Sequence, residues 1–180
     1  ADVVLIAGPT SLDPPQVGTV VRVRSAREMH DAVMAQWRGL DAAIMAAAVA
    51  DYTPADGAVT RKIEKGGPLT LTLERTTDIL KAMGERRAAE ARPVLIGFAA
   101  ETGDPVDRAS KKLTAKHVDL IVANDVTAEG SGFEVTTNQV TLVSHDGVEP
   151  LPLMSKIEVA SAILDRLERL LVSKITVATR

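Results

Sequence analysis

The run from Met45 to Tyr52 combines small side chains with a carboxylate at the end of an expected strand. Ala46, Ala47 and Ala48 would let another molecule approach the backbone closely, and Asp51 could bind a ligand hydroxyl or a hydrated metal ion. In open α/β sheets, ligands bind outside the carboxyl ends of the strands, which is where Asp51 would lie. The run therefore indicates a binding site whose ligand depends on the groups around it.

Two later strand ends add aromatic, polar and basic groups to this site. The Gly97–Glu101 run repeats the pattern of small residues followed by an acid, and its Phe98 could cover a base. The Ala123–Asp125 run closes the next strand with polar side chains. Three lysines could lean towards these ends: Lys62 in a glycine-containing loop, and Lys112 and Lys116, four residues apart on one helix face. Such a site suits a polyanionic nucleotide.

The elements that must position these residues alternate between strands and helices. Strands are expected over residues 2–7, 20–24, 42–47, 69–73, 93–99, 118–123 and 139–144. Helices are expected over residues 25–38, from a cap at Thr76 or Thr77 to residue 91, and over residues 105–116 and 155–171. The first and the last of them open with the capping boxes Ser25–Glu28 and Ser155–Glu158. The continuous apolar strands should be buried on both faces, whereas strict alternation in Leu69–Leu73 predicts one buried face and one wet face.

This alternation predicts an α/β fold, specifically a three-layer, Rossmann-like domain with a mostly parallel sheet. A late antiparallel hairpin is expected around the His145–Gly147 turn. With no internal repeat and no linker, we expect one domain over residues 1–171 and a C-terminal tail over residues 172–180. Because the chain opens directly on a strand, we expect the first βα segment, which normally binds phosphate, to be absent from this sequence.

Composition excludes several classes of protein. The 180 residues are 46% apolar and 25% charged, as in a soluble globular domain. A net charge of −3 and a pI near 5.7 argue against a general nucleic-acid binder. The absence of cysteine excludes disulfides and thiolate zinc sites and fits a reducing cytoplasm. No apolar run approaches the roughly 18 residues of a membrane span, and no signal peptide is evident.

Known motifs narrow the chemistry further. Neither G-x-G-x-x-G nor G-x-x-x-x-G-K-[ST] occurs, which disfavours a standard dinucleotide oxidoreductase and a P-loop NTPase. The three histidines are scattered, and no G-x-S-x-G elbow accompanies them. No motif predicts a metal held by the protein, so a Mg²⁺ ion would arrive mainly with a phosphate ligand.

The order of motifs resembles the phosphopantothenate–cysteine ligase family, also called phosphopantothenoylcysteine synthetase. In bacteria this ligase is usually the C-terminal half of a fused protein of coenzyme A biosynthesis. The motifs are A-A-A-V-A-D-Y, K-I-x-K, T-D-I-L, G-F-A-A-E-T, K-L-x-x-K, D-L-I-V-A-N-D-V, G-F and N-x-V-x-L. The likeness runs from Asp2 to about Leu171, which is nearly the whole chain.

The resemblance implies CTP-dependent ligation of cysteine to 4'-phosphopantothenate through an acyl-cytidylate, with Mg²⁺ and lysines favouring the charge changes. It implies that Lys62 is a catalytic residue on a mobile loop and that Asp51 binds the nucleotide at the ribose or through a cation. The implied nucleotide-binding residues are Ala46, Ala47, Ala48, Asp51, Lys62, Thr77, Asp78, Ile79, Leu80, Phe98, Lys112 and Lys116.

Departures from the family pattern keep other functions open. The third position of K-I-K-K is Glu64, and Thr77 replaces the usual proline before D-I. The segment expected to bind 4'-phosphopantothenate is not in this sequence, so the residues for that substrate and for cysteine are unassigned. The resemblance also implies a homodimer with subunits crossing around residues 62–73, and fusion to a flavin-dependent decarboxylase domain. The alternatives are a non-catalytic nucleotide-binding module and an NADPH-binding reductase.

Overall fold

The chain divides into two compact units that interleave in sequence. This computed structural model describes residues 1–16, 18–57, 62, 66–87, 90, 92–101, 105–125 and 135–178, with only the backbone for residues 101, 125 and 175–178. Unit 1 comprises Ala1–Trp37 and Ala47–Ile79, and unit 2 comprises Arg38–Ala46 and Leu80–Arg180. Each unit draws on two stretches of chain, so the division does not follow a linker.

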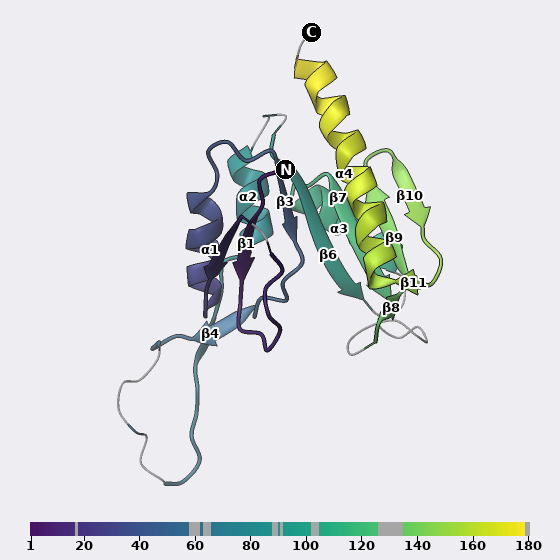
Figure 1. The fold of residues 1–180 in the computed structure, drawn as a ribbon. Coiled ribbons are helices and arrows are strands. Elements are labelled where there is room, and N and C mark those ends of the chain that lie inside the picture. The colour runs from purple at the N-terminus through teal and green to yellow at the C-terminus, as the bar shows by residue number, and fades with distance from the viewer. Residues whose placement is uncertain are drawn as a thin grey trace. The chain divides into compact units, whose positions relative to one another are not determined.

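Unit 2 is built on a five-stranded sheet with the strand order β10-β9-β7-β6-β3. Strands β3, β6 and β7 are parallel, whereas β9 and β10 add an antiparallel hairpin at one edge. This arrangement confirms the predicted sheet and its late hairpin (Figure 1). The strands are β3 Ala42–Met45, β6 Val94–Glu101, β7 Leu120–Asp125, β9 Val140–Ser144 and β10 Gly147–Pro150.

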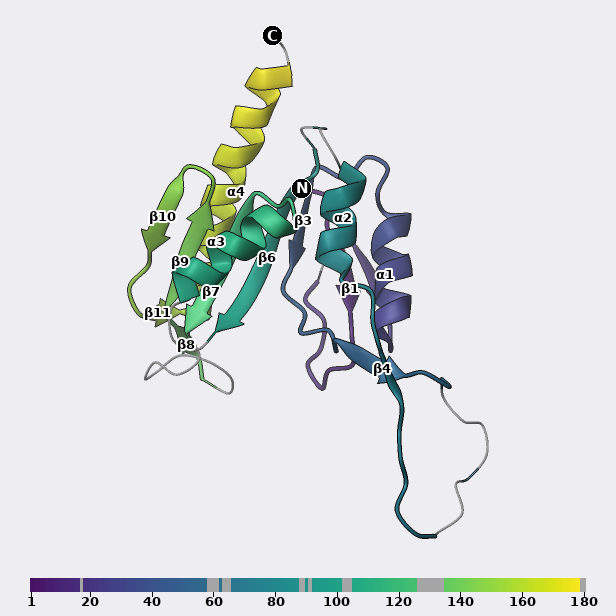
Figure 2. The ribbon, with the colours of Figure 1, turned by 180° about the vertical axis from the view of Figure 1, so that it is seen from behind.

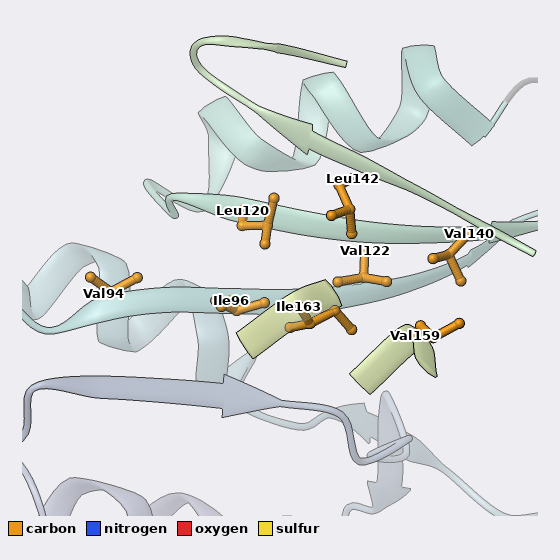
Figure 3. Close-up of a cluster of buried hydrophobic side chains, with 8 residues drawn as sticks. All are labelled: Val94, Ile96, Leu120, Val122, Val140, Leu142, Val159 and Ile163. Carbon is orange, nitrogen blue, oxygen red and sulfur yellow. The ribbon is translucent and has the colours of Figure 1, made fainter. Parts of the chain in front are cut away.

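Helices cover both faces of this sheet and confirm the three-layer prediction. Helix α4, Lys156–Ala178, lies on one face, and helix α3, Pro105–Ala115, lies on the other (Figures 1 and 2). The core between β6, β7, β9 and α4 is wholly aliphatic because alternate strand residues point to the same face. Figure 3 shows its members: Val94, Ile96, Leu120, Val122, Val140, Leu142, Val159 and Ile163.

Helix α4 begins at the predicted capping box and extends beyond its predicted end. Ser155 Oγ accepts from the Glu158 backbone N–H at 3.2 Å, and a Glu158 carboxylate oxygen accepts from the Ser155 N–H at 2.8 Å. The helix continues to Ala178, so residues 172–178 of the predicted tail are helical. Leu170 and Leu171 pack against the core, which explains why the helix does not end there. Just before it, β11 Met154–Ser155 pairs antiparallel with β8 Thr137–Asn138.

A buried ionic cluster that the sequence analysis missed joins four elements of unit 2. Asp119, just before β7, accepts hydrogen bonds from Arg87 at the end of α2, Ile79–Arg87, and from the Leu95 N–H at 2.8 Å. Lys174 near the end of α4 pairs with the other Asp119 carboxylate oxygen at 2.6 Å. Arg87 also donates to the His117 carbonyl oxygen at 2.6 Å. A carboxylate this buried depends on such partners because burial without them is costly.

Unit 1 holds two short strand pairs and one helix. Strand β1, Val4–Ala7, is parallel to β2, Thr19–Arg22, and is half-buried at most, so its predicted burial on both faces is wrong. Helix α1, Ala26–Ala35, has the predicted cap, with Ser25 Oγ accepting from Glu28 N–H at 3.1 Å. It ends before the predicted Arg38 because the N–H of Gln36 turns back to the Val33 carbonyl.

The second strand pair of unit 1 contradicts the expected burial of the Leu69–Leu73 run. Strand β4, Tyr52–Pro54, which the sequence did not indicate, pairs antiparallel with β5, Leu73–Arg75. The exposed fractions of Leu69, Leu71 and Leu73 are 64%, 62% and 54%. The prediction of one buried face is therefore wrong within this chain. A two-stranded ribbon offers no second layer against which its apolar side can pack.

The part of the chain that the structure describes contains no helix both long and apolar enough to cross a membrane.

Candidate functional site

In unit 2, the carboxyl ends of three parallel strands lie side by side, as the sequence predicts. Met45 at the end of β3 is paired with Gly97, and Ala99 of β6 is paired with Ala123 of β7. Strand β6 extends beyond the end of β3, so exposed Ala46 follows directly after the last β3–β6 pair. This edge of the sheet is the usual ligand position in α/β folds.

Phe98 and Asn124 lie on one face of this edge. Phe98 alternates with Ile96 and therefore faces the side of the sheet that α4 covers, with 40% of the residue exposed. Asn124 is paired with Ala100 in the next register position. Its side-chain oxygen is buried and meets no hydrogen-bond donor among the described residues. A ligand N–H group at this edge could donate a hydrogen bond to the Asn124 side-chain oxygen. The sequence signal for such a contact was a polar residue at the end of a buried strand.

Helix α2 packs on the opposite face through a glycine. A Cβ at Gly97 would lie 2.3 Å from Leu80 Cδ2, so only glycine admits Leu80 at this distance. Ile79 and Leu80 are 4% and 8% exposed, which makes their side chains part of the core. A ligand could therefore use only the backbone N–H groups of this first helical turn, in keeping with the predicted helix-start contact. Gly97 serves helix packing rather than ligand approach.

Lys112 and Lys116 lie at the end of α3 and just after it. The Lys116 N–H donates to the Lys112 carbonyl at 3.0 Å, and both residues are half-buried. A Cβ on Gly84 would lie 1.9 Å from the Lys116 carbonyl oxygen, so α2 and this turn are in close contact. Because α3 covers the face opposite α4, the two lysines and Phe98 belong to opposite sides of the sheet (Figures 1 and 2).

In unit 1, Thr76 connects the alanine-rich run with the residues before α2. Its hydroxyl donates to the Ala50 carbonyl at 2.6 Å, and its backbone N–H donates to the Asp51 carbonyl at 3.0 Å. These bonds join Asp51 to the residue directly before Thr77 and Asp78, and all three of Asp51, Thr77 and Asp78 are exposed. The predicted nucleotide residues Ala47 and Ala48, also exposed, precede this point in the chain.

Arg75, which was not among the predicted site residues, directly precedes Thr76 in the chain. Arg75 is opposite Tyr52 in the β4–β5 pair, with its guanidinium carbon 5.9 Å from the centre of the Tyr52 ring. The hydrogen bond that Arg75 donates to the Tyr52 hydroxyl oxygen is the main cause that raises the pKa of Arg75 above its ordinary value, and the charge of Asp51 adds a smaller increase. Its position directly before T-T-D-I-L was the available signal.

Lys62 lies in the segment between β4 and β5 and is exposed. Its predicted companions in K-I-E-K, residues 63–65, lie outside the described residues. The hairpin that carries Lys62 therefore starts from the Thr76–Asp51 connection.

Residues 1–171 match the family described as the DNA/pantothenate metabolism flavoprotein C-terminal domain. The chain belongs to this family. It is 45% identical over 94% of its length to the coenzyme A biosynthesis bifunctional protein CoaBC of Bacillus subtilis, and 41% identical over 95% of its length to that of Vibrio vulnificus. The chain covers 42% and 43% of these two relatives, which is less than half of each.

Two solved structures share the fold of this chain. A crystal structure of the C-terminal domain of CoaBC is 42% identical, with a TM-score of 0.75 over 96% of this chain and 77% of that one. A Cab2 mutant in complex with phosphopantothenate-cysteine has a TM-score of 0.68 over 90% of this chain and 55% of the other. Its identity is 14%, so it supports the fold alone.

Proposed function

We propose that this chain is the ligase part of a coenzyme A biosynthesis protein and joins cysteine to 4'-phosphopantothenate at the expense of CTP. The observation that carries the proposal is the shared carboxyl edge of β3, β6 and β7 in a chain of this family. The names of the relatives, which concern coenzyme A biosynthesis, support the same activity.

The proposed reaction has two steps. The carboxylate of 4'-phosphopantothenate attacks the α-phosphorus of CTP, an acyl–phosphate bond forms, and pyrophosphate leaves. The amine of cysteine then attacks the acyl carbon of the acyl-cytidylate, an amide forms, and CMP leaves with the bonding electron pair. Both steps change the charge on phosphate oxygens, which is the situation in which positioned cations lower a barrier.

The residues proposed for this reaction are those that the resemblance to the ligase family implies. In unit 1, Lys62 is the catalytic cation, and Asp51 binds the nucleotide near Thr77 and Asp78. In unit 2, Phe98 lies by the base, and the backbone at Leu80 offers N–H groups. The remaining proposed nucleotide contacts are Ala46, Ala47, Ala48, Ile79, Lys112 and Lys116.

Magnesium in this proposal is bound by the CTP phosphates. Among the described residues, no group of three His, Cys, Asp or Glu side chains is placed to hold a metal ion. The donor set therefore does not fit a metal held by the protein alone, and neither step above is routed through one. The proposal assigns to Mg²⁺ only the neutralisation of triphosphate charge.

The partners proposed from the resemblance are a second copy of this chain and a flavin-dependent decarboxylase domain of the same polypeptide, in the cytoplasm. The exposed leucines Leu69, Leu71 and Leu73 support the homodimer because large apolar side chains that are exposed close to one another in the chain favour an interface. The covered share of the CoaBC relatives, 42% to 43%, supports a further domain in those proteins.

The test is cysteine-dependent release of pyrophosphate from CTP and 4'-phosphopantothenate by the natural polypeptide that contains this sequence. We expect release with the wild type and a loss of at least 100-fold with Lys62→Ala, as for removal of a charge-stabilising group. Absence of pyrophosphate release from the wild type would contradict the proposed function. Full activity of Lys62→Ala would contradict the proposed role of Lys62. Unfolding shifts with NADPH but not CTP would instead favour a reductase.

A further inference from the structure

We propose that Thr76 is a positioning residue that holds Asp51 beside the start of α2 and thereby sets the affinity for the nucleoside triphosphate. The inference rests on the proposed function. Thr76 is half-buried, whereas Asp51, Thr77 and Asp78 are exposed. Its hydroxyl proton is already committed to the Ala50 carbonyl at 2.6 Å, so its role is to place its neighbours.

The two Thr76 bonds join residues that are distant in sequence, 26 positions apart for the hydroxyl bond to Ala50 and one fewer for the backbone bond to Asp51, and they have different chemical origins. The backbone N–H bond to the Asp51 carbonyl, at 3.0 Å, continues the β4–β5 pairing by one position beyond Tyr52 and Arg75. The hydroxyl bond reaches one residue further back, to Ala50. The first bond is available to any residue except proline, whereas only a side-chain donor of this length can make the second.

The hydroxyl bond therefore restrains the backbone at Ala50, directly before Asp51. Without it, the backbone bond still closes the hairpin, and residues 47–51 gain conformational freedom. Nucleotide binding would then have to order this segment, which weakens the affinity. Because β4 starts and β5 ends at the backbone bond, the hairpin that carries Lys62 keeps its base when the hydroxyl is removed.

The test compares Thr76→Val, which keeps the shape and removes the hydroxyl, with Thr76→Ser, which keeps the hydroxyl. Ser161→Ala is the matched control because Ser161 also donates to a backbone carbonyl, that of Ile157 at 3.1 Å, on a helix that carries none of the proposed nucleotide contacts. CTP affinity is measured by calorimetry, KM and kcat by pyrophosphate release, and unfolding temperature without ligand by scanning calorimetry.

We expect Thr76→Val to raise both the Kd and the KM for CTP about tenfold, the effect of one net hydrogen bond. We expect kcat within about twofold, because Thr76 touches no reacting group. Thr76→Ser should recover wild-type affinity, and Ser161→Ala should equal the wild type. Hydrogen exchange of residues 47–53 without nucleotide should be faster in Thr76→Val than in Thr76→Ser.

Three results would overturn the inference. One is unchanged CTP affinity in Thr76→Val, which leaves the proposed function standing. Another is an equal loss in Thr76→Ser, which would show that the hydroxyl is irrelevant. If Thr76→Val does not fold, Thr76→Ala replaces it with the same expectation, and a failure of both to fold would mark Thr76 as a structural residue. A wild type without CTP binding would instead reject the proposed function and this inference together.

Discussion

Strand β6 and the Leu69–Leu73 segment both carry large aliphatic side chains, yet those side chains are buried in one and exposed in the other. Leu95 and Ile96 of β6 are fully buried, whereas Leu69 and Leu71 are 64% and 62% exposed. Strand β6 has a strand on each side and a helix on each face. The leucine segment leads into a two-stranded ribbon. Apolar side chains in a segment predict that it packs against other residues. Whether those residues belong to the same chain depends on the elements next to the segment.

The largest expected effect is in the ionic cluster of unit 2. Asp119→Ala should lower the free energy of unfolding by about 3–5 kcal/mol because it leaves Arg87 buried without its carboxylate. Asp41→Ala, which breaks the exposed ion pair with Arg92, is the control and should cost about 0–1 kcal/mol. Urea titrations measure both, and equal losses would show that burial does not distinguish these two pairs.

A matched pair of leucine truncations tests the comparison directly. Leu95→Ala should lower the free energy of unfolding by about 2–5 kcal/mol because it opens a cavity in a packed core. Leu71→Ala should change it by no more than about 0.5 kcal/mol at protein concentrations where the chain is monomeric. A large loss for Leu71→Ala under those conditions would place Leu71 in the core of the single chain.

A charged substitution sharpens the comparison by addressing the proposed dimer. Leu71→Asp should weaken self-association at least tenfold and leave the unfolding of the monomer nearly unchanged, because a desolvated carboxylate is costly only in an interface. Sedimentation equilibrium measures the association constant, with Leu164→Asp at an exposed position of α4 as the control. Unchanged association in Leu71→Asp, or a loss as great in the control, would reject the leucine run as the interface.

The smallest effect concerns the cap of α4. The hydrogen bonds from Ser155 lower the pKa of Glu158, so its stabilising contribution is complete above the ordinary value of about 4.5 and declines as the pH falls through the lowered value. Glu158→Gln should therefore reduce the unfolding temperature slightly at pH 7, and the difference from the wild type should shrink towards pH 3. A difference that is constant with pH would contradict this account of the cap.

The sequence predicted most of unit 2 because its signals are local and agree with one another. Buried strands such as β6 and β7 are continuous apolar runs, and Ser155–Glu158 begins α4 as expected. The end of α4 was predicted too early because its last turns depend on contacts with Asp119 and the core, which are distant in sequence.

The candidate site was predictable in its strand ends but not in its connections. Adjacent parallel strands brought Ala46, Phe98 and Asn124 to one edge, as the alternation of strands and helices requires. Thr76 bonds to Ala50, 26 residues earlier in the chain, and Gly97 packs against Leu80 of another element. A single sequence does not reveal such distant pairs. The position of Leu80 in the core likewise depends on the packing of α2 against β6.

Detection of an acyl-cytidylate tests the central claim most directly because it separates catalysis from nucleotide binding. The natural polypeptide is mixed with CTP, Mg²⁺ and 4'-phosphopantothenate without cysteine, and the products are analysed by mass spectrometry. The account predicts an adduct of CMP and 4'-phosphopantothenate that disappears when cysteine is added, and a greatly reduced yield with Lys62→Ala. CTP binding without this adduct would contradict the account and identify a nucleotide-binding module.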